Sequence, residues 1–325
     1  MKRAKARECA QRGAAWLRGL LQDDGSFRGA AALDCYYKAP CALAFSGFRD
    51  DAARVLDHVA ARYLLPGGDL DGAGVSWYDR FRLYPHAWLL WAAVELRRSE
   101  LAEPLAAFLA TRRNPETGGF RADDNGTEEI MTTSIAGIAM LRAGHQDAAI
   151  GAGHWLRRVF EAQPDLTRGL LHVWRPGKGL DEGDGSEWFR VNTSQARQWY
   201  FQYGISAALL ADLARVTGDR TWLTLAGQYL RASEHCHADR YSTPQSGKIG
   251  WGAAWTGSLT GDAAQLALTS TVVDTLAALQ GADGSWNGEG VYDAQPAPET
   301  AAARLDVTAE FVALLSMMDG GKFEL

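Results

Sequence analysis

Two stretches near opposite ends of the chain share one turn sequence, Gln22-Asp-Asp-Gly-Ser-Phe27 and Gln280-Gly-Ala-Asp-Gly-Ser-Trp286. A looser copy, Arg113-Asn-Pro-Glu-Thr-Gly-Gly-Phe120, lies between them. Each copy follows a stretch with the apolar periodicity of an amphipathic helix and precedes another helical stretch. Glycine permits the tight turn, and the aromatic residue can fold back between helix ends. A turn that recurs in this way predicts a fold built from repeated helical units.

A second recurring signal marks the ends of other helices. At four places a glycine is followed within three residues by an aspartate, namely Asp50, Asp147, Asp219 and Asp262. The glycine ends one helix in the left-handed conformation, and the aspartate caps the next helix by accepting its free N–H groups. Together the two signals predict about twelve helices, over residues 4–21, 33–47, 50–64, 80–98, 101–112, 130–143, 147–161, 195–217, 220–236, 248–260, 262–280 and 300–318.

These predicted helices alternate between two kinds of surface. In the third helix Val55, Leu56 and Val59 form one apolar stripe, whereas residues 133–141 of the sixth are apolar or small nearly all round. A helix with one apolar stripe covers a core, and a helix that is apolar on every side lies inside it. The alternation predicts an all-α (α/α)6 barrel, or toroid, with an inner and an outer ring of helices. No linker interrupts the pattern, so we expect a single domain over residues 1–325.

The connections between these helices also alternate in length. Those that lead from an inner to an outer helix are short, and those that lead back are long, the longest running from Glu161 to Gln195. Long connections in a compact domain usually carry function. The alternation therefore predicts a pocket on one face of the toroid, at the N-termini of the inner helices.

Composition narrows the class of protein. The 325 residues are 47% hydrophobic and 22% charged, and a net charge of −6 without a basic block argues against a nucleic-acid partner. The apolar runs are too short to span a bilayer, and residues 1–13 lack the apolar core of a signal peptide. Four irregularly spaced cysteines fit reduced thiols, so we expect a cytoplasmic protein. No P-loop or dinucleotide fingerprint is present, so we expect no cofactor. The expected partner is a small-molecule substrate.

The turn sequences resemble the Gln-x-x-Asp-Gly-x-Trp repeats of terpenoid cyclases of the squalene–hopene cyclase type. Residues Arg12-Gly-Ala-Ala-Trp16-Leu17 are similar to the lead-in of the same repeat. The resemblance implies the α/α toroid that cyclases share with protein prenyltransferase β-subunits. The Asp-x-Asp-Asp motif of class II cyclases is absent, because Asp69-Leu-Asp71-Gly72 stops short of it. The zinc ligands of the prenyltransferases are not reproduced either, since Asp34 and Cys35 are adjacent instead of spaced.

Polar residues near the starts of the inner helices are the candidate catalytic groups. Asp34, Tyr37 and Lys38 open the second helix, where burial would raise the pKa of Asp34 and suit it to act as a general acid. The alternative is a capping aspartate paired with Lys38 one turn away. The fourth helix brings His86 as a catalytic candidate, with a substrate-binding set of Trp77, Tyr84 and Trp88. The alternative there is an aromatic core layer around a satisfied histidine.

The later inner helices add further candidates. Asp306 and Glu310, one turn apart on an otherwise apolar helix, are a second pair of acids. The substrate-binding candidates are Arg197, Tyr200, Lys248, Trp251 and the repeat residue Trp286. His235-Cys236-His237 invites a zinc interpretation, but ligands this close rarely share one tetrahedral metal, so we expect no metal site.

We expect from these features an atypical enzyme of the terpenoid-cyclase fold, an isomerase, cyclase or lyase of specialised metabolism. Its substrate would be largely apolar, with aromatic rings stabilising positive charge and Asp34 or Asp306 supplying the proton. Helix N-termini, with Arg197 and Lys248, would favour an anionic group on that substrate. One alternative is a carbohydrate-active (α/α)6-barrel hydrolase, lyase or epimerase acting on a sugar or uronic acid. Another is a non-catalytic toroid that binds a ligand.

Overall fold

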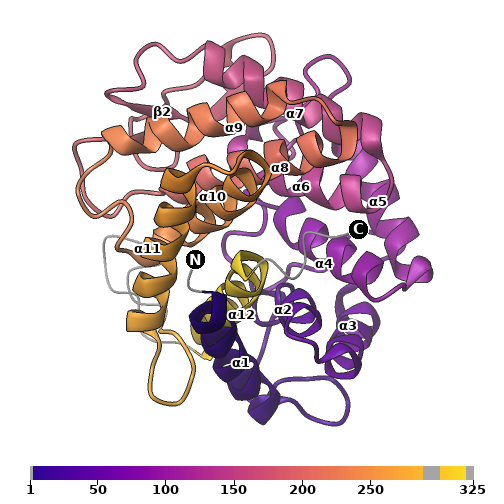
Figure 1. Ribbon diagram of the computed structural model, residues 1–325. Coiled ribbons are helices and arrows are strands. Elements are labelled where there is room, and N and C mark those ends of the chain that lie inside the picture. Colours follow the sequence, from indigo (N-terminus) through magenta and orange to yellow (C-terminus); the bar gives the residue numbers. More distant parts are fainter. Residues whose placement is uncertain (1–2, 288–300, 320–325) are drawn as a thin grey trace.

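A computed structural model of the chain describes residues 3–287 and 301–319, which contain twelve α-helices and several short strands (Figure 1). The inner ring consists of α2 (Ala39–Phe45), α4 (Leu83–Glu95), α6 (Ile130–Arg142), α8 (Phe201–Thr217), α10 (Gly247–Thr260) and α12 (Ala301–Met318). The outer ring consists of α1 (Arg3–Leu20), α3 (Arg49–Tyr63), α5 (Ser99–Arg112), α7 (Gln146–Glu161), α9 (Thr221–Ala232) and α11 (Ala263–Leu279).

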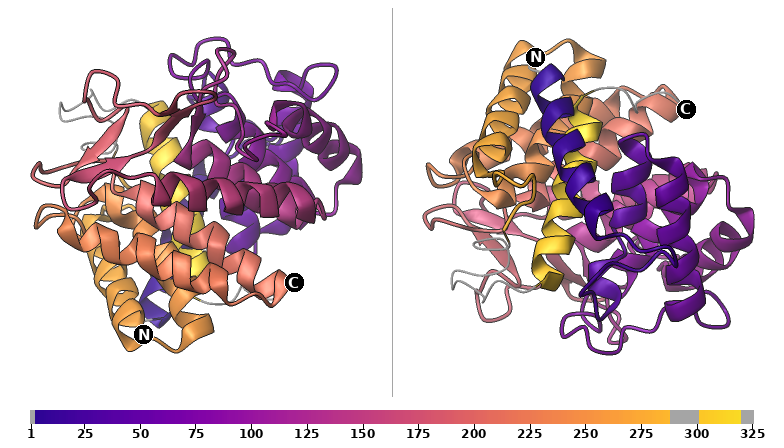
Figure 2. Two further views of the ribbon diagram at one scale, coloured as in Figure 1. Left: turned by 90° about the horizontal axis from the view of Figure 1, so that it is seen from above. Right: turned by 90° about the horizontal axis from the view of Figure 1, so that it is seen from below.

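The inner helices form a closed ring. Each one packs against the next inner helix along the chain, and α12 packs against α2. The outer helix that follows an inner helix covers it, and α1 covers α12, so the two ends of the chain complete the ring together (Figure 2). The predicted all-α (α/α)6 barrel is therefore confirmed.

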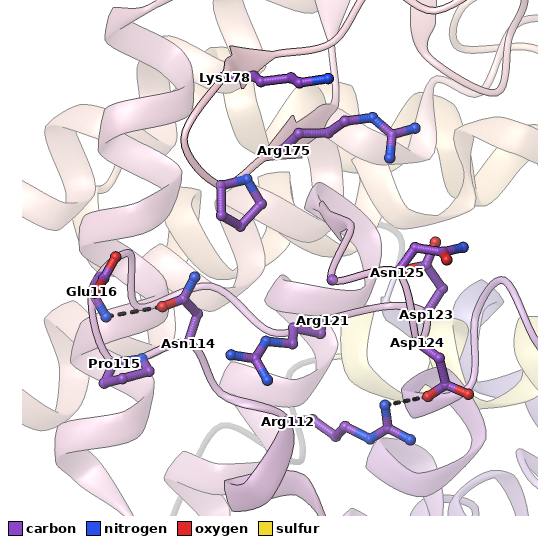
Figure 3. A pocket seen from close by; sticks show the side chains of 12 residues that line it. Arg112, Asn114, Pro115, Glu116, Arg121, Asp123, Asp124, Asn125, Arg175 and Lys178 are labelled. Atoms are coloured by element: carbon purple, nitrogen blue, oxygen red, sulfur yellow. Dashed lines mark hydrogen bonds and ion pairs between the residues drawn. The ribbon is translucent and has the colours of Figure 1, made fainter.

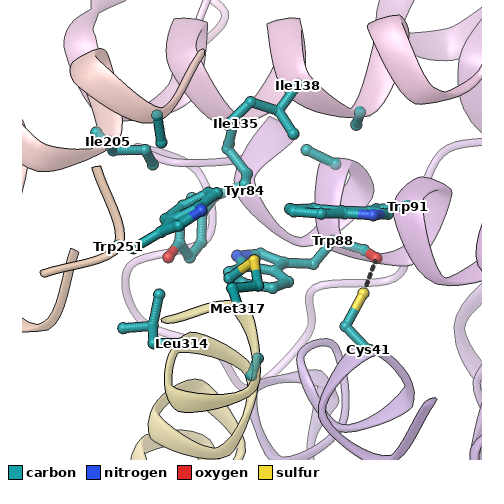
Figure 4. Close-up of a cluster of buried hydrophobic side chains, with 14 of the residues drawn as sticks. Cys41, Tyr84, Trp88, Trp91, Ile135, Ile138, Ile205, Trp251, Leu314 and Met317 are labelled. Carbon is teal, nitrogen blue, oxygen red and sulfur yellow. Dashed lines mark hydrogen bonds between the residues drawn. The ribbon is translucent and has the colours of Figure 1, made fainter. Parts of the chain in front are cut away.

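Burial follows the two kinds of surface seen in the sequence. Every residue of α2 is buried, whereas α3 buries only one side, including Val55, Leu56 and Val59. Glycines let α8 and α10 approach closely, because a Cβ added at Gly204 would lie 2.1 Å from the Lys248 carbonyl oxygen. Large aromatic side chains of the inner helices fill the centre of the ring (Figure 4).

The repeated turn lies in four of the six long connections, where it joins one helix pair to the next. Its glycine has a positive φ and touches a backbone carbonyl of the following outer helix. An added Cβ would lie within 2.0–2.6 Å of that carbonyl oxygen in four pairs: Gly25 with Arg54, Gly68 with Pro104, Gly118 with Gly151, and Gly284 with Arg12. The last pair closes the outer ring onto α1. The second of these turns ends in Leu70 instead of an aromatic residue, and so escapes the sequence pattern.

Helix boundaries differ from the prediction in two instructive places. The eighth helix begins at Phe201 and not at 195, because Arg197 has a φ of 60° and its N–H donates to Asp239 Oδ2 at 2.8 Å. The single helix predicted over 33–47 is a short 3-10 turn, Leu33–Cys35, followed by α2. Residue 300, predicted to start the last helix, lies outside the described residues.

The long connection between α7 and α8 is ordered by small antiparallel sheets. Strand β2 (Gly169–Leu171) pairs with β5 (Arg190–Asn192), with Leu170 opposite Val191. Strand β3 (Val173–Arg175) lies between β1 (Glu128–Glu129) and β4 (Gly179–Leu180). The sequence predicts an irregular lid or a disordered excursion here, because such short strands leave no periodic signal. None of the helices within 3–287 and 301–319 combines the length and apolarity needed to cross a membrane.

Candidate active site

A cavity of about 420 Å³ lies at the N-terminal ends of the inner helices, where the sequence places a pocket. All six inner helices, or the residues just before them, contribute to its lining. The contributing side chains include Tyr37, Lys38, Tyr84, Met131, Phe201, Lys248, Asp306 and Glu310. The long connections supply the rest of the wall, so the alternating loop lengths explain why the cavity opens at this end of the barrel.

Four charged side chains form a hydrogen-bonded chain at this cavity, which we call the mouth cluster: Lys38, Asp306, Glu310 and Lys248. Lys38 Nζ donates to Asp306 Oδ2 at 2.9 Å and to Glu310 Oε2 at 2.5 Å. Lys248 Nζ donates to Glu310 Oε1, also at 2.5 Å. The chain links α12 to the starts of α2 and α10, and both ammonium groups are almost completely buried.

The two carboxyl groups of the mouth cluster titrate differently. Burial raises the pKa of Asp306 to about 6, although the ammonium group of Lys38 opposes this. Burial would also raise the pKa of Glu310, but Lys248 and Lys38 on either side outweigh it and hold the pKa at about 2. Glu310 is therefore a fixed anion, whereas Asp306 changes its protonation close to neutral pH.

Asp34 is a third carboxyl group on the cavity wall. It accepts a weak hydrogen bond from Cys35 Sγ at 3.6 Å and forms no ion pair with any residue that the structure describes. Burial raises the pKa of this carboxyl. An acid that borders a cavity and is not held by an ammonium group is free to exchange a proton with a bound molecule.

Aromatic rings make up much of the remaining wall, from Tyr37, Trp77, Phe81, Tyr84, Trp188, Trp199 and Phe201. Trp188, on the long α7–α8 connection, is 36% exposed. Its ring stacks on Phe81 with centroids 6.0 Å apart and meets Trp199 edge-on at 4.9 Å. The guanidinium of Arg80 lies 4.6 Å from the centre of the Trp188 ring. These contacts hold a large ring at the rim of the cavity with part of its surface open to a ligand.

Eight of the predicted site residues line this cavity: Asp34, Tyr37, Lys38, Trp77, Tyr84, Lys248, Asp306 and Glu310. Sequence reasoning missed Ser76, Phe81, Met131, Trp188, Trp199, Phe201 and Gln245. Several of these adjoin predicted residues, so the starts of the fourth and eighth helices already carried a signal for them. Trp188 had none, because its stretch of sequence shows no periodicity.

His86 does not line the cavity, in contrast to its predicted catalytic role. Its Nδ1 lies 2.7 Å from the Arg82 carbonyl oxygen, and its Nε2 lies 3.2 Å from Asp69 Oδ1. The imidazole stacks on Phe108 of α5 at 4.5 Å, so it faces the outer ring. Burial lowers its pKa. The position agrees with the alternative interpretation in that the histidine is buried in the core and away from the cavity.

Three predicted tryptophans are packed in the core. Trp88 stacks on Trp91 with centroids 5.9 Å apart, and Trp251 lies beside the same ring at 6.0 Å (Figure 4). Trp286 is buried against Phe311, and its Nε1 donates to the Leu276 carbonyl oxygen at 2.7 Å. None of the three lines the cavity.

The remaining candidates meet at Asp239, outside the cavity lining. Tyr200 donates its hydroxyl proton to Asp239 Oδ1 at 2.6 Å, and the exposed Arg197 donates its backbone N–H to the same carboxylate. His237 Nδ1 lies 2.8 Å from Asp239 Oδ1, while the neighbouring Cys236 donates to a tyrosine hydroxyl. The Asp239 carboxylate thus holds the segment before α8 in place. Arg197 and Tyr200 were predicted to contact a substrate, and in the structure both bind this carboxylate.

No protein-family model and no curated protein sequence matches this chain. Three solved structures have a similar fold at low sequence identity. A family 76 glycoside hydrolase from a bovine Bacteroides thetaiotaomicron strain is 13% identical, with a TM-score of 0.65 over 96% of this chain and 77% of that one. D-mannose isomerase is 12% identical, with a TM-score of 0.66 over 95% and 97%. An unsaturated glucuronyl hydrolase specific for heparin is 11% identical, with a TM-score of 0.62 over 97% and 96%.

These similarities correct the predicted family. The matching structures are carbohydrate-active enzymes and not terpenoid cyclases, so the resemblance to cyclases and the cyclase type of activity are wrong. The repeated turn has a structural reason that does not depend on chemistry. Its glycine fits against a carbonyl of the next outer helix and so joins neighbouring helix pairs. At such low identity the similarity establishes the fold, and the activity has to be argued from the cavity.

Proposed function

We propose that this chain is a carbohydrate-active enzyme that acts on a sugar or uronic acid by acid–base chemistry in the 420 Å³ cavity. One observation carries the proposal: an aromatic wall and the unpaired carboxyl group of Asp34 occur in the same cavity. The volume is within the range of about 300–1,000 Å³ that small-molecule sites occupy. The similar structures, which include two hydrolases and an isomerase, support sugar chemistry without favouring one reaction.

The two kinds of wall suit the two sides of a pyranose ring. Its C–H face is apolar and packs against aromatic rings such as Trp77 and Trp188, while its hydroxyl groups need hydrogen-bond partners. The mouth cluster offers such partners along one side of the cavity, with donors from Lys38 and Lys248 and acceptors from Asp306 and Glu310. Because these groups already bond to one another, a substrate hydroxyl joins an existing network without leaving a buried charge unpaired.

The carboxyl groups take separate roles in this proposal. Asp34 transfers the proton, since burial raises its pKa although the charge of Lys38 opposes this, and it forms no ion pair with any residue that the structure describes. Glu310 stays ionised and keeps the two lysines in place. Asp306 has a pKa of about 6, so it can gain or lose a proton and thereby change the net charge of the mouth cluster while Asp34 transfers its proton. Proton transfer by a carboxyl group is common to hydrolysis, elimination and epimerisation of sugars, so the site residues do not select among them.

A ligand screen followed by product analysis tests the proposal. Tryptophan fluorescence is a suitable readout, because three tryptophans line the cavity. The ligands are manno-oligosaccharides, unsaturated glucuronyl disaccharides and free mannose, and any that bind are incubated with the protein and their products identified by chromatography and mass spectrometry. We expect at least one class to bind and to be converted. Failure of every class to bind would overturn the proposal.

Asp34→Asn tests the assignment of the proton donor. We expect kcat to fall about 10²- to 10⁴-fold, the usual contribution of a positioned acid or base. Asp23→Asn is the matched control, because Asp23 is an exposed aspartate on the connection before α2 and lies outside the cavity. Unfolding curves should be the same for both variants. Unchanged turnover in Asp34→Asn would remove Asp34 from the mechanism.

A further inference from the structure

A second hollow lies on the loop-bearing face, between the α5–α6 connection and the β3–β4 hairpin. It is an open groove of about 670 Å³ lined by residues 112–126 and 175–178 (Figure 3). Arg121 extends into it from the connection, and Lys178 lies on the hairpin at the opposite side (Figure 3). The groove takes no part in the proton transfer proposed above, and its polar lining contrasts with the aromatic wall of the cavity.

Two cations of this groove are available to a ligand. Among the residues that the structure describes, Arg121 and Lys178 form no side-chain hydrogen bond or ion pair. The other two cations are occupied, since Arg112 donates to Asp124 at 2.6 Å and Arg175 is paired with Asp181. The free guanidinium and ammonium groups are therefore the strongest unused hydrogen-bond donors of the groove.

The acidic residues of the groove are largely committed to the protein. Asp124 accepts from Arg112 and also from Arg82, at 3.2 Å. Asp123 accepts the backbone N–H of Thr127 at 2.9 Å and holds the turn before β1. Their charges are thus directed toward neighbouring protein groups. The third acid of the lining, Glu116, is exposed in the groove, so the acidic groups of a ligand would have to lie beside Arg121 and Lys178 and apart from Glu116.

The groove adjoins the cavity through a shared wall. A buried void of about 10 Å³ separates the groove from the cavity. Asp123 lines both the groove and the void, and Phe81 and Trp188 line both the void and the cavity. Arg80 covers this void and donates to the Trp188 carbonyl oxygen at 2.8 Å. The partly exposed Trp188 ring thus forms part of the wall of both the void and the cavity.

We propose that the groove binds the distal units of an acidic oligosaccharide whose terminal unit occupies the cavity. This inference rests on the proposed function and adds the substrate class. The chain crosses the rim over Trp188, and the carboxylate groups of its distal units are bound by Arg121 and Lys178. Arginine matches a carboxylate in a bidentate geometry, so these groups favour an acidic chain over a neutral one of equal length.

The test measures binding as a function of chain length in the full-length protein. The probes are oligogalacturonates of one to four units and manno-oligosaccharides of the same lengths, with tryptophan fluorescence as the readout. In the Arg121→Gln, Lys178→Gln double variant, we expect the acidic tetramer to bind ~tenfold more weakly, equivalent to ~1.4 kcal/mol. Binding of the single unit should be unchanged. The matched control is Arg158→Gln, Arg220→Gln, which removes the same charge from an exposed arginine of α7 and from the exposed arginine just before α9.

The outcomes separate the groove from the proposed function. If the double variant binds acidic chains of every length as tightly as the wild type does, the groove is not a binding site, although the cavity can still act on sugars. Equal losses for neutral and acidic chains would overturn the preference for an acidic ligand. If the wild-type protein binds no sugar of any length, the proposed function fails and the inference falls with it.

Discussion

The two ends of the inner ring each hold a buried cluster of charges, but only one of them borders the cavity. At the C-terminal end, Asp212 of α8 lies between two arginines, in what we call the base cluster. Its carboxylate is 2.8 Å from Arg142 Nη2 and 2.7 Å from Arg215 Nη2. The guanidinium of Arg142 also lies 5.6 Å from the Trp91 ring and 5.5 Å from the Trp255 ring. Asp212 is completely buried.

The difference between the clusters follows from the connections around them. Short connections at the C-terminal end bring the helices together, so the base cluster is enclosed by core tryptophans. Long connections at the N-terminal end leave the mouth cluster beside a cavity that a ligand can enter. Buried charge alone is therefore no sign of a functional site in this fold. Its position relative to the long connections distinguishes a structural ion pair from a candidate catalytic one.

The largest expected effect is at the base cluster. Asp212→Asn leaves two arginines without their shared counter-ion, and we expect the free energy of unfolding to fall by about 3–5 kcal/mol. Glu310→Gln is the matched change in the mouth cluster, where Asp306 stays beside Lys38 and water in the cavity can solvate Lys248. We expect it to cost less than half as much. Urea denaturation at pH 7 measures both, and equal losses would contradict the distinction between the two ends.

A smaller effect is expected on the pH dependence of stability, which distinguishes the mouth cluster from the base cluster. The pKa of Asp306 is raised to about 6, so the folded protein binds this proton more tightly than the unfolded chain does. The group therefore favours the folded state fully below about pH 4, and that contribution, on the order of 3 kcal/mol, is lost as the pH rises through about 6.

The matching variant is Asp306→Asn, measured by urea denaturation in steps from pH 4 to pH 6.5. Relative to the wild type, we expect the stability of the variant to rise across this interval, because it lacks the loss that ionisation of Asp306 causes. Glu310 is present in both proteins, and since its pKa is lowered to about 2 its contribution changes only below about pH 4.5, at the acid end of the series. A constant difference between the two proteins would show that Asp306 titrates elsewhere.

Two glycine substitutions compare the long connections with the short ones. Gly68 in a long connection and Gly144 in a short one have the same φ of 86°. A Cβ at Gly68 would lie 2.0 Å from the Pro104 carbonyl oxygen, whereas at Gly144 nothing lies within 4 Å. We expect Gly144→Ala to cost about 1 kcal/mol from backbone strain alone, and Gly68→Ala to cost at least ~1 kcal/mol more. Thermal unfolding checks the order, and equal costs would exclude a role of the turn in joining repeats.

The smallest effect on stability is expected at the rim of the cavity. Trp188→Ala removes a partly exposed ring, so we expect the unfolding free energy to change by less than ~1 kcal/mol while sugar affinity falls ~tenfold. Trp16→Ala is the control, because Trp16 is a half-buried tryptophan of outer helix α1 outside the cavity. Isothermal titration with the best ligand of the screen provides the measurement. Retained affinity in Trp188→Ala would show that the rim does not contact the sugar.

Local patterns in the sequence are enough to predict the helices, their division into two rings and the face on which the cavity opens. These features depend on apolar periodicity and on glycine and aspartate at helix ends, which act over a few residues. The same local signal identified Asp34, Lys38, Asp306 and Glu310, because polar residues at the start of a buried helix are conspicuous. It did not identify the family, since the repeated turn reflects the spacing of helix pairs and not the chemistry of a site.

Which of these residues lie together depends on how the ring of helices closes. Lys38 and Glu310 are separated by nearly the whole chain and meet because α12 packs against α2. The side chain of His86 points toward the outer ring, and Trp188 lies at the cavity although its connection has no periodic sequence pattern. The physical reason is that burial and charge pairing depend on the direction in which a side chain points once the ring has closed. That direction is set by packing between distant helices, which no short stretch of sequence contains.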